Sequence, residues 1–292
     1  MSLIKNQVYQ RIISGVIAAL FFSISIYFAM TPFLNLLFFI LLLLVTVAAS
    51  KEYYELLKAK GIQPLTTIGL FGAGLITTTF YISAFNSTYI YLPLFSFFLL
   101  FLFSFVYLFQ DNTQPLIRLS TTFFSYIYIV IPFCVVFNIL YFFPANSKQD
   151  SRWWIVYTLI TTKAMDIGGY IVGKSFGKNL LIPSISPKKT WEGLIGGVFF
   201  TILCSVFLIF LLSLVYKQTP LDLSFTWGII LGLILAILSI LGDLSESLLK
   251  RDANVKDSGF LPGLGGFLDM VDSLIFTIPF MYFFLLYYFQ NG

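Results

Sequence analysis

The feature that most constrains this chain is a repeated apolar run about as long as a helix that crosses a membrane. A helix needs about 20 apolar residues to cross the hydrocarbon core of a bilayer. Because backbone polar groups must be satisfied internally there, such runs favour helices. Nine runs of this kind occur in the 292 residues, at about 11–30, 33–50, 65–84, 88–109, 121–145, 152–172, 193–216, 225–248 and 265–289. The sequence therefore predicts an all-α, polytopic integral membrane protein with about nine transmembrane helices.

The composition excludes several classes of protein. Only 10% of the residues are charged, whereas soluble domains carry about 25%, so the charges are too few to cover a water-exposed surface. The chain contains no histidine, which excludes imidazole bases and histidine-ligated zinc. Its two cysteines, Cys134 and Cys204, lie inside apolar runs, so neither a disulfide framework nor a thiolate metal site is expected. A metal site would need oxygen ligands, which favours Mg²⁺.

The distribution of lysine and arginine gives the expected orientation. Cytoplasmic connections of membrane proteins carry an excess of these residues. With nine spans, 13 of the 17 Lys and Arg residues fall on the side of the N-terminus. We therefore expect a cytoplasmic N-terminus, and we expect the two most polar connections, residues 173–192 and 249–264, to face the cytoplasm as well.

Two parts are expected along the chain. Residues 1–150 hold about five spans, whereas residues 151–292 hold about four spans and both polar connections. The second part is therefore the candidate catalytic region. In the first part, residues 51–60 have an amphipathic pattern, which predicts a short stretch at the membrane interface.

The first polar segment covers residues 163–193. Asp166 lies inside an apolar span, where a carboxylate costs about 2.5–3.5 kcal/mol. That cost favours a functional role, although Lys163, one turn earlier, could be a merely structural partner. Four lysines follow, and they suit a polyanionic phosphate but would also occur in a cytoplasmic loop without a ligand: Lys174, Lys178, Lys188 and Lys189.

Residues 186–193 (SPKKTWEG) begin the next span. Thr190, Glu192 and backbone N–H groups would then lie at the N-terminus of a helix, which is a natural site for anions. Residues 168–175 (GGYIVGKS) match the pattern of a nucleotide-binding P-loop, but a P-loop follows a strand of an α/β domain. No such domain is expected here, so we reject that interpretation.

The second polar segment covers residues 242–273. Two sets of residues recur at intervals of three or four and should each share a helix face; they are Asp243, Glu246, Ser247 and Lys250, then Asp269, Asp272 and Ser273. Basic residues and a glycine-rich turn at 262–266 lie between them. Carboxylates bind Mg²⁺ and basic side chains neutralise phosphate, so this pattern favours phosphoryl-transfer chemistry. The alternative is a salt-bridged loop that only orders the last helix.

Both segments resemble the phosphatidate cytidylyltransferases, also called CDP-diacylglycerol synthases. In the second segment the resemblance rests on Ser247, Lys250-Arg251, Lys256-Asp257, Pro262-Gly263, Gly265-Gly266, Asp269 and Asp272. The 186–193 block and the stretch around Asp166 are similar too, whereas the N-terminal half resembles the family only in being hydrophobic. Two positions depart from the family pattern, because Leu264 stands where a histidine is usual and Met270 where an arginine is usual.

The resemblance implies a nucleotidyltransferase of phospholipid biosynthesis that converts CTP and phosphatidate into CDP-diacylglycerol and pyrophosphate. It implies the inner (plasma) membrane, an active site facing the cytoplasm, Mg²⁺ as cofactor and no nucleic-acid partner. We expect catalytic roles for Asp243, Asp269, Lys250, Arg251 and Lys256, and Mg²⁺ ligation by Asp243, Asp269 and Asp272. The expected substrate-binding residues are Asp166, Ser186, Lys188, Lys189, Thr190, Glu192, Ser247, Asp257, Gly265 and Gly266.

Two other functions fit similar residues. A CTP-dependent kinase acting on a polyprenol or another lipid would need a comparable site. An ion-coupled transporter could use Asp166, Asp243 and Asp269 as an ion path, but the polar residues cluster at one end of the spans and no repeated halves occur. Small residues four apart, at Gly193/Gly197 and Gly228/Gly232, predict close helix contacts, either within the chain or in a homodimer.

Overall fold

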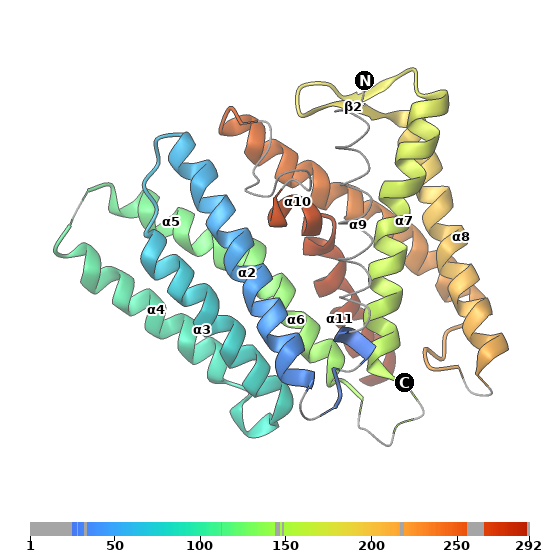
Figure 1. Cartoon of the computed structure of the whole chain (residues 1–292), viewed down its shortest axis with the longest axis horizontal. Helices are drawn as coiled ribbons and strands as arrows, with labels where there is room; N and C mark the ends of the chain where they lie inside the picture. The colour runs from blue at the N-terminus through green and yellow to red at the C-terminus, as the bar shows by residue number, and fades with distance from the viewer. Residues whose placement is uncertain are drawn as a thin grey trace, which may run out of the picture. The chain divides into compact units, whose positions relative to one another are not determined.

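The structure, a computed structural model, describes residues 25–27, 29–31, 34–111, 113–143, 147, 149–216, 219–255 and 266–290. The chain forms two compact units. Unit 1 comprises Met1–Asn138 and Leu249–Val271, and unit 2 comprises Ile139–Leu248 and Asp272–Gly292. Almost all regular structure is helical (Figure 1), which confirms the predicted all-α class.

Unit 1 is built from helices of the N-terminal half, joined by a short helix from near the C-terminus. Its elements are α2 (Leu34–Ala59), α3 (Thr66–Phe85), η1 (Ser87–Tyr89), α4 (Leu92–Leu108), α5 (Pro115–Ser125), η2 (Tyr126–Val130), most of α6 (Ile131–Leu140) and α10 (Phe267–Val271). The segments α5, η2 and α6 form one continuous helix with a π-helical turn in its middle. Pro132 follows this turn, and a proline has no N–H to continue regular α-helical bonding.

Glycines allow tyrosines into the core of unit 1. A side chain on Gly72 would overlap the hydroxyl group of Tyr126, and one on Gly69 would overlap that of Tyr54. In this space the Tyr126 hydroxyl donates a hydrogen bond to the carbonyl of Ile68 at 2.9 Å. Small residues therefore bring α2, α3 and η2 close together, as is usual for helices packed in membranes.

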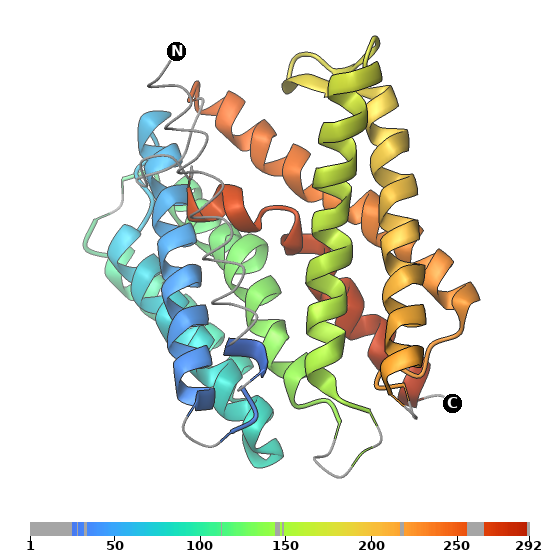
Figure 2. The same ribbon diagram turned by 45° about the vertical axis from the view of Figure 1, so that its right-hand side comes forward.

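Unit 2 contains a helix pair, a small hairpin and two further helices. Its elements are α7 (Ser151–Phe176), β1 (Leu180–Ile182), β2 (Ser186–Thr190), α8 (Trp191–Val215), α9 (Phe225–Asp252), whose last residues belong to unit 1, and α11 (Leu274–Gln290). The strands are antiparallel, with Leu180 opposite Thr190 and Ile182 opposite Ser186. Figures 1 and 2 both show α7 and α8 side by side, with the hairpin at one end of the pair.

Both glycine rows noted in the sequence lie at contacts between helices of unit 2. A Cβ on Gly193 would lie 2.9 Å from the carbonyl oxygen of Gly169, and one on Gly232 would lie 2.9 Å from the Cα of Ile202. Such separations leave no room for a side chain. The rows therefore serve packing within the chain, of α7 on α8 and of α8 on α9.

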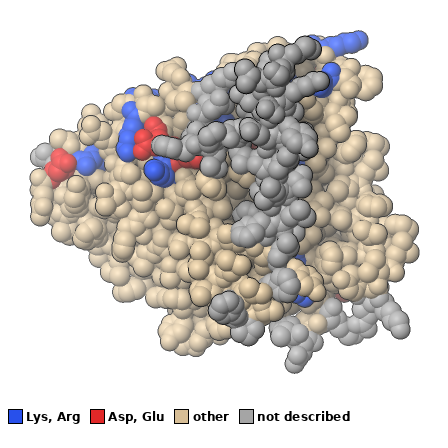
Figure 3. Space-filling model, viewed as in Figure 1, with Lys and Arg blue, Asp and Glu red and all other residues tan. Residues whose placement is uncertain are grey.

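Seven helical segments among the described residues are long and apolar enough to cross a membrane. They are Leu34–Ala59, Thr66–Phe85, Ser87–Leu108, Pro115–Leu140, Trp191–Val215, Phe225–Asp252 and Phe267–Phe289. On the face shown in Figure 3, most of the visible surface carries no charged side chain. These observations confirm a polytopic membrane protein.

The count of nine spans and the orientation stay predictions. Most of the expected span 11–30 lies outside the described residues. The expected span 152–172 corresponds to the 26-residue helix α7, which is long enough to cross a bilayer. It is not among the seven, because polar residues in its middle, including Lys163 and Asp166, lower its mean hydropathy.

Local structure differs from the sequence-based expectation in the polar segments. Residues 51–59 continue helix α2 to its end at Ala59, and the expected place of 51–60 at the membrane interface stays a prediction. The connection 173–192 begins as the last turn of α7 and contains the β1–β2 hairpin. At the connection 249–264, α9 continues to Asp252, and residues 256–265 lie outside the described part of the chain.

The expected single helix through Asp269, Asp272 and Ser273 is interrupted. Helix α10 ends at Val271 and α11 begins at Leu274, so the prediction that these three residues share one continuous helix face was wrong. The Asp272 side chain accepts a hydrogen bond from the backbone N–H of Ser273 at 2.5 Å. Local bonds of this kind compete with helical hydrogen bonds.

Candidate active site

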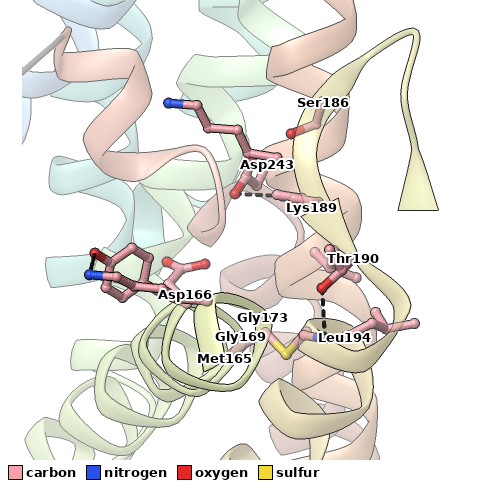
Figure 4. A pocket seen from close by; sticks show the side chains of 14 residues that line it. Met165, Asp166, Gly169, Gly173, Ser186, Lys189, Thr190, Leu194 and Asp243 are labelled. Carbon is pink, nitrogen blue, oxygen red and sulfur yellow. Dashed lines mark hydrogen bonds and ion pairs between the residues drawn. The ribbon is translucent and has the colours of Figure 1, made fainter. Parts of the chain in front are cut away.

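A cavity of about 490 Å³ lies in unit 2, lined by residues of α7, β2, α8 and α9. Figure 4 shows its two kinds of wall. Glycines of α7 and α8 line it without a side chain, and lysine, hydroxyl and carboxylate groups line other parts. A cavity with glycines in its wall and both signs of charge suits a charged, phosphate-bearing ligand better than an apolar one.

The end of the hairpin begins α8 and forms part of this wall. The hydroxyl group of Thr190 accepts a hydrogen bond from the backbone N–H of Gly193 at 3.1 Å and so caps the helix. Glu192, in the first turn, accepts hydrogen bonds from the backbone N–H groups of Lys178 at 3.1 Å and Asn179 at 3.2 Å. Glu192 therefore fastens the start of the hairpin, and its expected role in substrate binding stays a prediction.

An ion pair joins the hairpin to α9. The Nζ atom of Lys189 lies 2.7 Å from Oδ2 of Asp243, and both side chains are about a quarter exposed. Figure 4 shows the two residues meeting at the cavity. The Ser247 hydroxyl donates to Asp243 at 3.5 Å, a long hydrogen bond. Lys188 also lines the cavity, is exposed, and has no ion pair among the described residues.

Asp166 lines the same cavity from α7. Lys163 lies 3.2 Å from Asp166, which confirms the structural partnership that their spacing allowed. Lys163 also donates a hydrogen bond to the hydroxyl group of Ser273 at 2.8 Å. This lysine therefore links α7 to the interruption before α11, and its charge balances one of the acids nearby.

Asp272 lies at that interruption and is only 7% exposed. It is close enough to Asp243 and Asp166 for their charges to act on it. A side chain at Gly242 would overlap the carbonyl oxygen of Asp272. Gly242 thus lets the interrupted segment lie directly against α9, one residue before Asp243. Unit 2 therefore brings together three of the acids singled out in the sequence.

A second set of the expected residues lies in unit 1, around α10. Asp269 forms an ion pair with Lys250, near the C-terminal end of α9. It also accepts a hydrogen bond from the backbone N–H of Gly266 at 2.9 Å. Arg251 is exposed at the end of α9. Three other expected residues, Lys256, Asp257 and Gly265, lie outside the described residues, so their roles stay predictions.

Glu52 was not among the residues predicted from the sequence. This residue lies on α2, is only 3% exposed, and accepts hydrogen bonds from the backbone N–H groups of Phe267 at 2.9 Å and Leu268 at 2.8 Å. A signal was present, because Glu52 lies only two residues after the end of the long apolar run 33–50. The amphipathic interpretation of 51–60 placed it at the membrane surface instead.

The donor set is compatible with Mg²⁺. No three His, Cys, Asp or Glu residues within the described ranges form a ready-made metal cluster. Mg²⁺ does not need one, since proteins usually bind it through one or two carboxylates together with substrate phosphates and water. The buried Asp272 and the partly exposed Asp243 provide oxygen ligands of this kind in unit 2.

Similarity to known proteins identifies the family of this chain. A sequence model of the group described as "Cytidylyltransferase family" matches residues 9–288. The chain belongs to the cytidylyltransferase family. A Bacillus subtilis relative named "Phosphatidate cytidylyltransferase" is 32% identical over 283 residues, which cover 94% of this chain and 97% of that protein.

Two chlamydial proteins similar to this chain carry the same name as the Bacillus subtilis relative. The protein of Chlamydia pneumoniae is 29% identical over 289 residues, covering 96% of this chain and 92% of the relative. That of Chlamydia muridarum is 40% identical over 171 residues, covering 58% of this chain and 55% of the relative. The similarity to members of the family thus includes the N-terminal half, for which hydrophobicity was the only resemblance noted in the sequence.

Proposed function

We propose that this protein is a phosphatidate cytidylyltransferase, which converts CTP and phosphatidate into CDP-diacylglycerol and pyrophosphate. The observation that carries the proposal is the similarity to the Bacillus subtilis protein of that name over nearly the full length of both chains. The cavity beside Lys189 and Asp243 supports it, because it offers cations and carboxylates to a phosphate-bearing ligand.

The reaction needs little acid–base chemistry from the protein. An oxygen of the lipid phosphate attacks the α-phosphorus of CTP, and the bond from that phosphorus to the oxygen bridging the β-phosphorus breaks. Pyrophosphate leaves with the electron pair of that bond. The attacking oxygen is already anionic, so the absence of histidine from the chain is no obstacle. Catalysis of this kind depends on positioning and on charge stabilisation.

The basic residues would stabilise the phosphates. In this proposal Lys188 and Lys189 hold phosphate groups at the cavity, assisted by hydrogen bonds from Ser186 and Thr190. Lys189 lines the cavity, and its ion pair with Asp243 holds its ammonium group at the cavity wall. The remaining basic residues, Lys250, Arg251 and Lys256, would offset the charge of the triphosphate and of the leaving pyrophosphate.

The acids would hold Mg²⁺ and line the polar space. We propose Asp243, Asp269 and Asp272 as ligands, Asp166 as a wall of the cavity, and Ser247 as a support for Asp243. When bound, Mg²⁺ would neutralise phosphate charge and orient the phosphate oxygens. Two of these carboxylates have a lysine partner, Asp243 in Lys189 and Asp269 in Lys250.

We further propose that the enzyme lies in the inner (plasma) membrane with its site facing the cytoplasm, where CTP is available. A cysteine at Ser184, an exposed residue between β1 and β2, would react with a membrane-impermeant maleimide in inside-out vesicles but not in intact spheroplasts. The reverse pattern would refute this orientation. A homodimer stays a prediction, and the glycine rows no longer support it because they pack within unit 2.

Labelled nucleotide tests the activity directly. Purified protein is incubated with phosphatidate and CTP labelled with ³²P at either the α- or the γ-phosphorus. The proposal predicts label in the lipid only from α-labelled CTP, and labelled pyrophosphate from γ-labelled CTP. Transfer of the γ-label to the lipid, or to a polyprenol supplied in a parallel reaction, would establish the kinase alternative. No transfer to lipid from either nucleotide would refute the proposal.

A further inference from the structure

We propose that Glu52 is a positioning residue for catalysis, which fixes the N-terminus of α10 and thereby the carboxylate of Asp269. The inference rests on the proposed function, because the role of Asp269 is part of it. The inference gives a positioning role to a residue of the N-terminal half, in which no functional residue was predicted from the sequence.

The contact is specific and involves both oxygens of the carboxylate. Oε1 of Glu52 accepts from the N–H of Phe267 at 2.9 Å, and Oε2 accepts from the N–H of Leu268 at 2.8 Å. These N–H groups belong to the first two residues of α10. The first N–H groups of a helix have no partner within the helix, and a carboxylate satisfies them well.

The local sequence explains why this cap comes from another helix. The residue before α10 is Gly266, which has no side chain that could accept these hydrogen bonds. Ser, Thr, Asp and Asn are preferred at this position because their side chains accept a hydrogen bond from an N–H of the first turn. A helix of five residues has few internal hydrogen bonds and depends strongly on its ends. Glu52 therefore replaces the missing local cap.

Asp269 belongs to the same arrangement. It is the third residue of α10, and its Oδ2 accepts from the N–H of Gly266 at 2.9 Å, as the third residue does in a capping box. Its other oxygen, Oδ1, pairs with Lys250. Two carboxylates, Glu52 and Asp269, thus satisfy three consecutive N–H groups. Loss of the Glu52 contacts would free the turn that determines where Asp269 points.

Packing alone does not account for a glutamate at this position. Glu52 is almost fully buried in a helix that is otherwise apolar enough to cross a membrane. A carboxylate in such surroundings is costly unless it is hydrogen-bonded or paired. A glutamine would be less costly to bury, but its amide has one oxygen and would place an NH₂ group opposite one of the two N–H donors.

The test compares Glu52→Gln with Glu55→Gln in the full-length purified protein. Glu55 lies one turn later on α2, its side chain is 42% exposed, and among the described residues its ion pair is with Lys58, so it controls for the same chemical change. Three quantities are measured: amide hydrogen exchange of residues 266–271 without substrate, CDP-diacylglycerol formation, and the Mg²⁺ concentration that gives half-maximal rate. Thermal unfolding reports any general loss of stability.

We expect Glu52→Gln to exchange the amides of 266–271 faster than wild type. We also expect it to lower kcat and raise the half-maximal Mg²⁺ concentration, each by about 10–100-fold, while the KM for CTP changes less. Glu55→Gln should match wild type in all three measurements. Glu52→Asp, whose side chain is one methylene shorter and cannot reach both N–H groups, should fail to restore the rate.

Three outcomes would overturn the inference. One is a Glu52→Gln variant that matches Glu55→Gln in exchange and in Mg²⁺ dependence. Another is faster exchange with an unchanged rate and Mg²⁺ dependence, which would leave Glu52 a structural cap only. The third is a Glu52→Gln variant whose lower rate is fully explained by a lower unfolding temperature. If wild type forms no CDP-diacylglycerol, the proposed function fails instead, while the exchange measurement still reports on the cap.

Discussion

The two candidate carboxylates Asp243 and Asp269 are held in different ways. Asp243 lies within the 28-residue helix α9 and forms an ion pair with Lys189 at the cavity wall. Asp269 lies in the five-residue helix α10 and depends on Gly266 and Lys250 for its orientation. A long helix fixes its residues through its own hydrogen bonds, whereas a short helix needs partners at its ends.

Different substitutions should therefore impair the roles of Asp243 and Asp269. The position of Asp243 should be insensitive to changes elsewhere in the chain, but its ion-pair partner, Lys189, comes from the hairpin. The position of Asp269 should depend on Glu52, which is distant in sequence but lies in the same unit, and on the ion pair with Lys250. Substitutions can separate these two dependencies.

The largest effect is expected from removing either acid. Asp243→Ala and Asp269→Ala should each lower CDP-diacylglycerol formation by about 100–1000-fold, since each removes a charge-stabilising or metal-binding group. Only Asp269→Ala should also speed amide exchange at residues 266–271, because Asp269 accepts from the N–H of Gly266. Gel filtration checks that both variants stay folded. Near-normal turnover of either variant at saturating Mg²⁺ would show that its acid has no such role.

A smaller effect is expected from the two neighbouring lysines of the hairpin. Lys189→Met removes the partner of Asp243 and should lower kcat by about 10–100-fold. Lys188→Met removes an exposed cation and should mainly raise the KM of one substrate, by less than about tenfold. Steady-state kinetics with CTP and phosphatidate separate the two. Equal losses in kcat for both variants would contradict a special role of the Lys189–Asp243 pair.

Packing beside the cavity provides a test of stability. Gly193→Ala would place a Cβ 2.9 Å from the carbonyl oxygen of Gly169, and overpacking of this kind costs about 1–3 kcal/mol of unfolding free energy. Gly74→Ala in α3 is the matched control, because its Cβ would meet only Leu43 at an ordinary 3.8 Å. Unfolding in a denaturing detergent measures both. Equal stability of the two variants would contradict the close α7–α8 contact.

The smallest effect is expected at Glu192. Glu192→Gln keeps one carbonyl oxygen for the N–H groups of Lys178 and Asn179 and should lower activity by less than about fivefold, since solvent replaces much of an exposed contact. Amide exchange at residues 178–179 should nevertheless increase. A loss as large as that of Lys189→Met would indicate that Glu192 contacts substrate directly.

Features that depend on local sequence could be predicted. Apolar runs predicted the existence of α8 and α9, because burial in lipid requires about 20 apolar residues in a helix. The spacing of Lys163 and Asp166 allowed their ion pair, since residues three apart on a helix are neighbours. The glycine rows at 193/197 and 228/232 predicted close helix contacts, because small residues four apart lie on one helix face and let two helices approach closely.

Features that depend on distant residues could not be predicted. Glu52 and Phe267 are separated by 215 positions, and nothing near Glu52 indicates that its partner is a backbone N–H of α10. The interruption at Asp272 depends on one side chain bonding its neighbour's N–H instead of continuing the helix. The β1–β2 hairpin has strands of three and five residues, too short for their alternation to stand out in a lysine-rich connection.

The proposed activity is tested most directly by the product balance of the purified protein with CTP, phosphatidate and Mg²⁺, measured with and without EDTA. We predict that CDP-diacylglycerol and pyrophosphate form in equal amounts, that EDTA abolishes both, and that excess Mg²⁺ restores them. Formation of CDP with a newly phosphorylated lipid, or full activity in EDTA, would contradict this prediction.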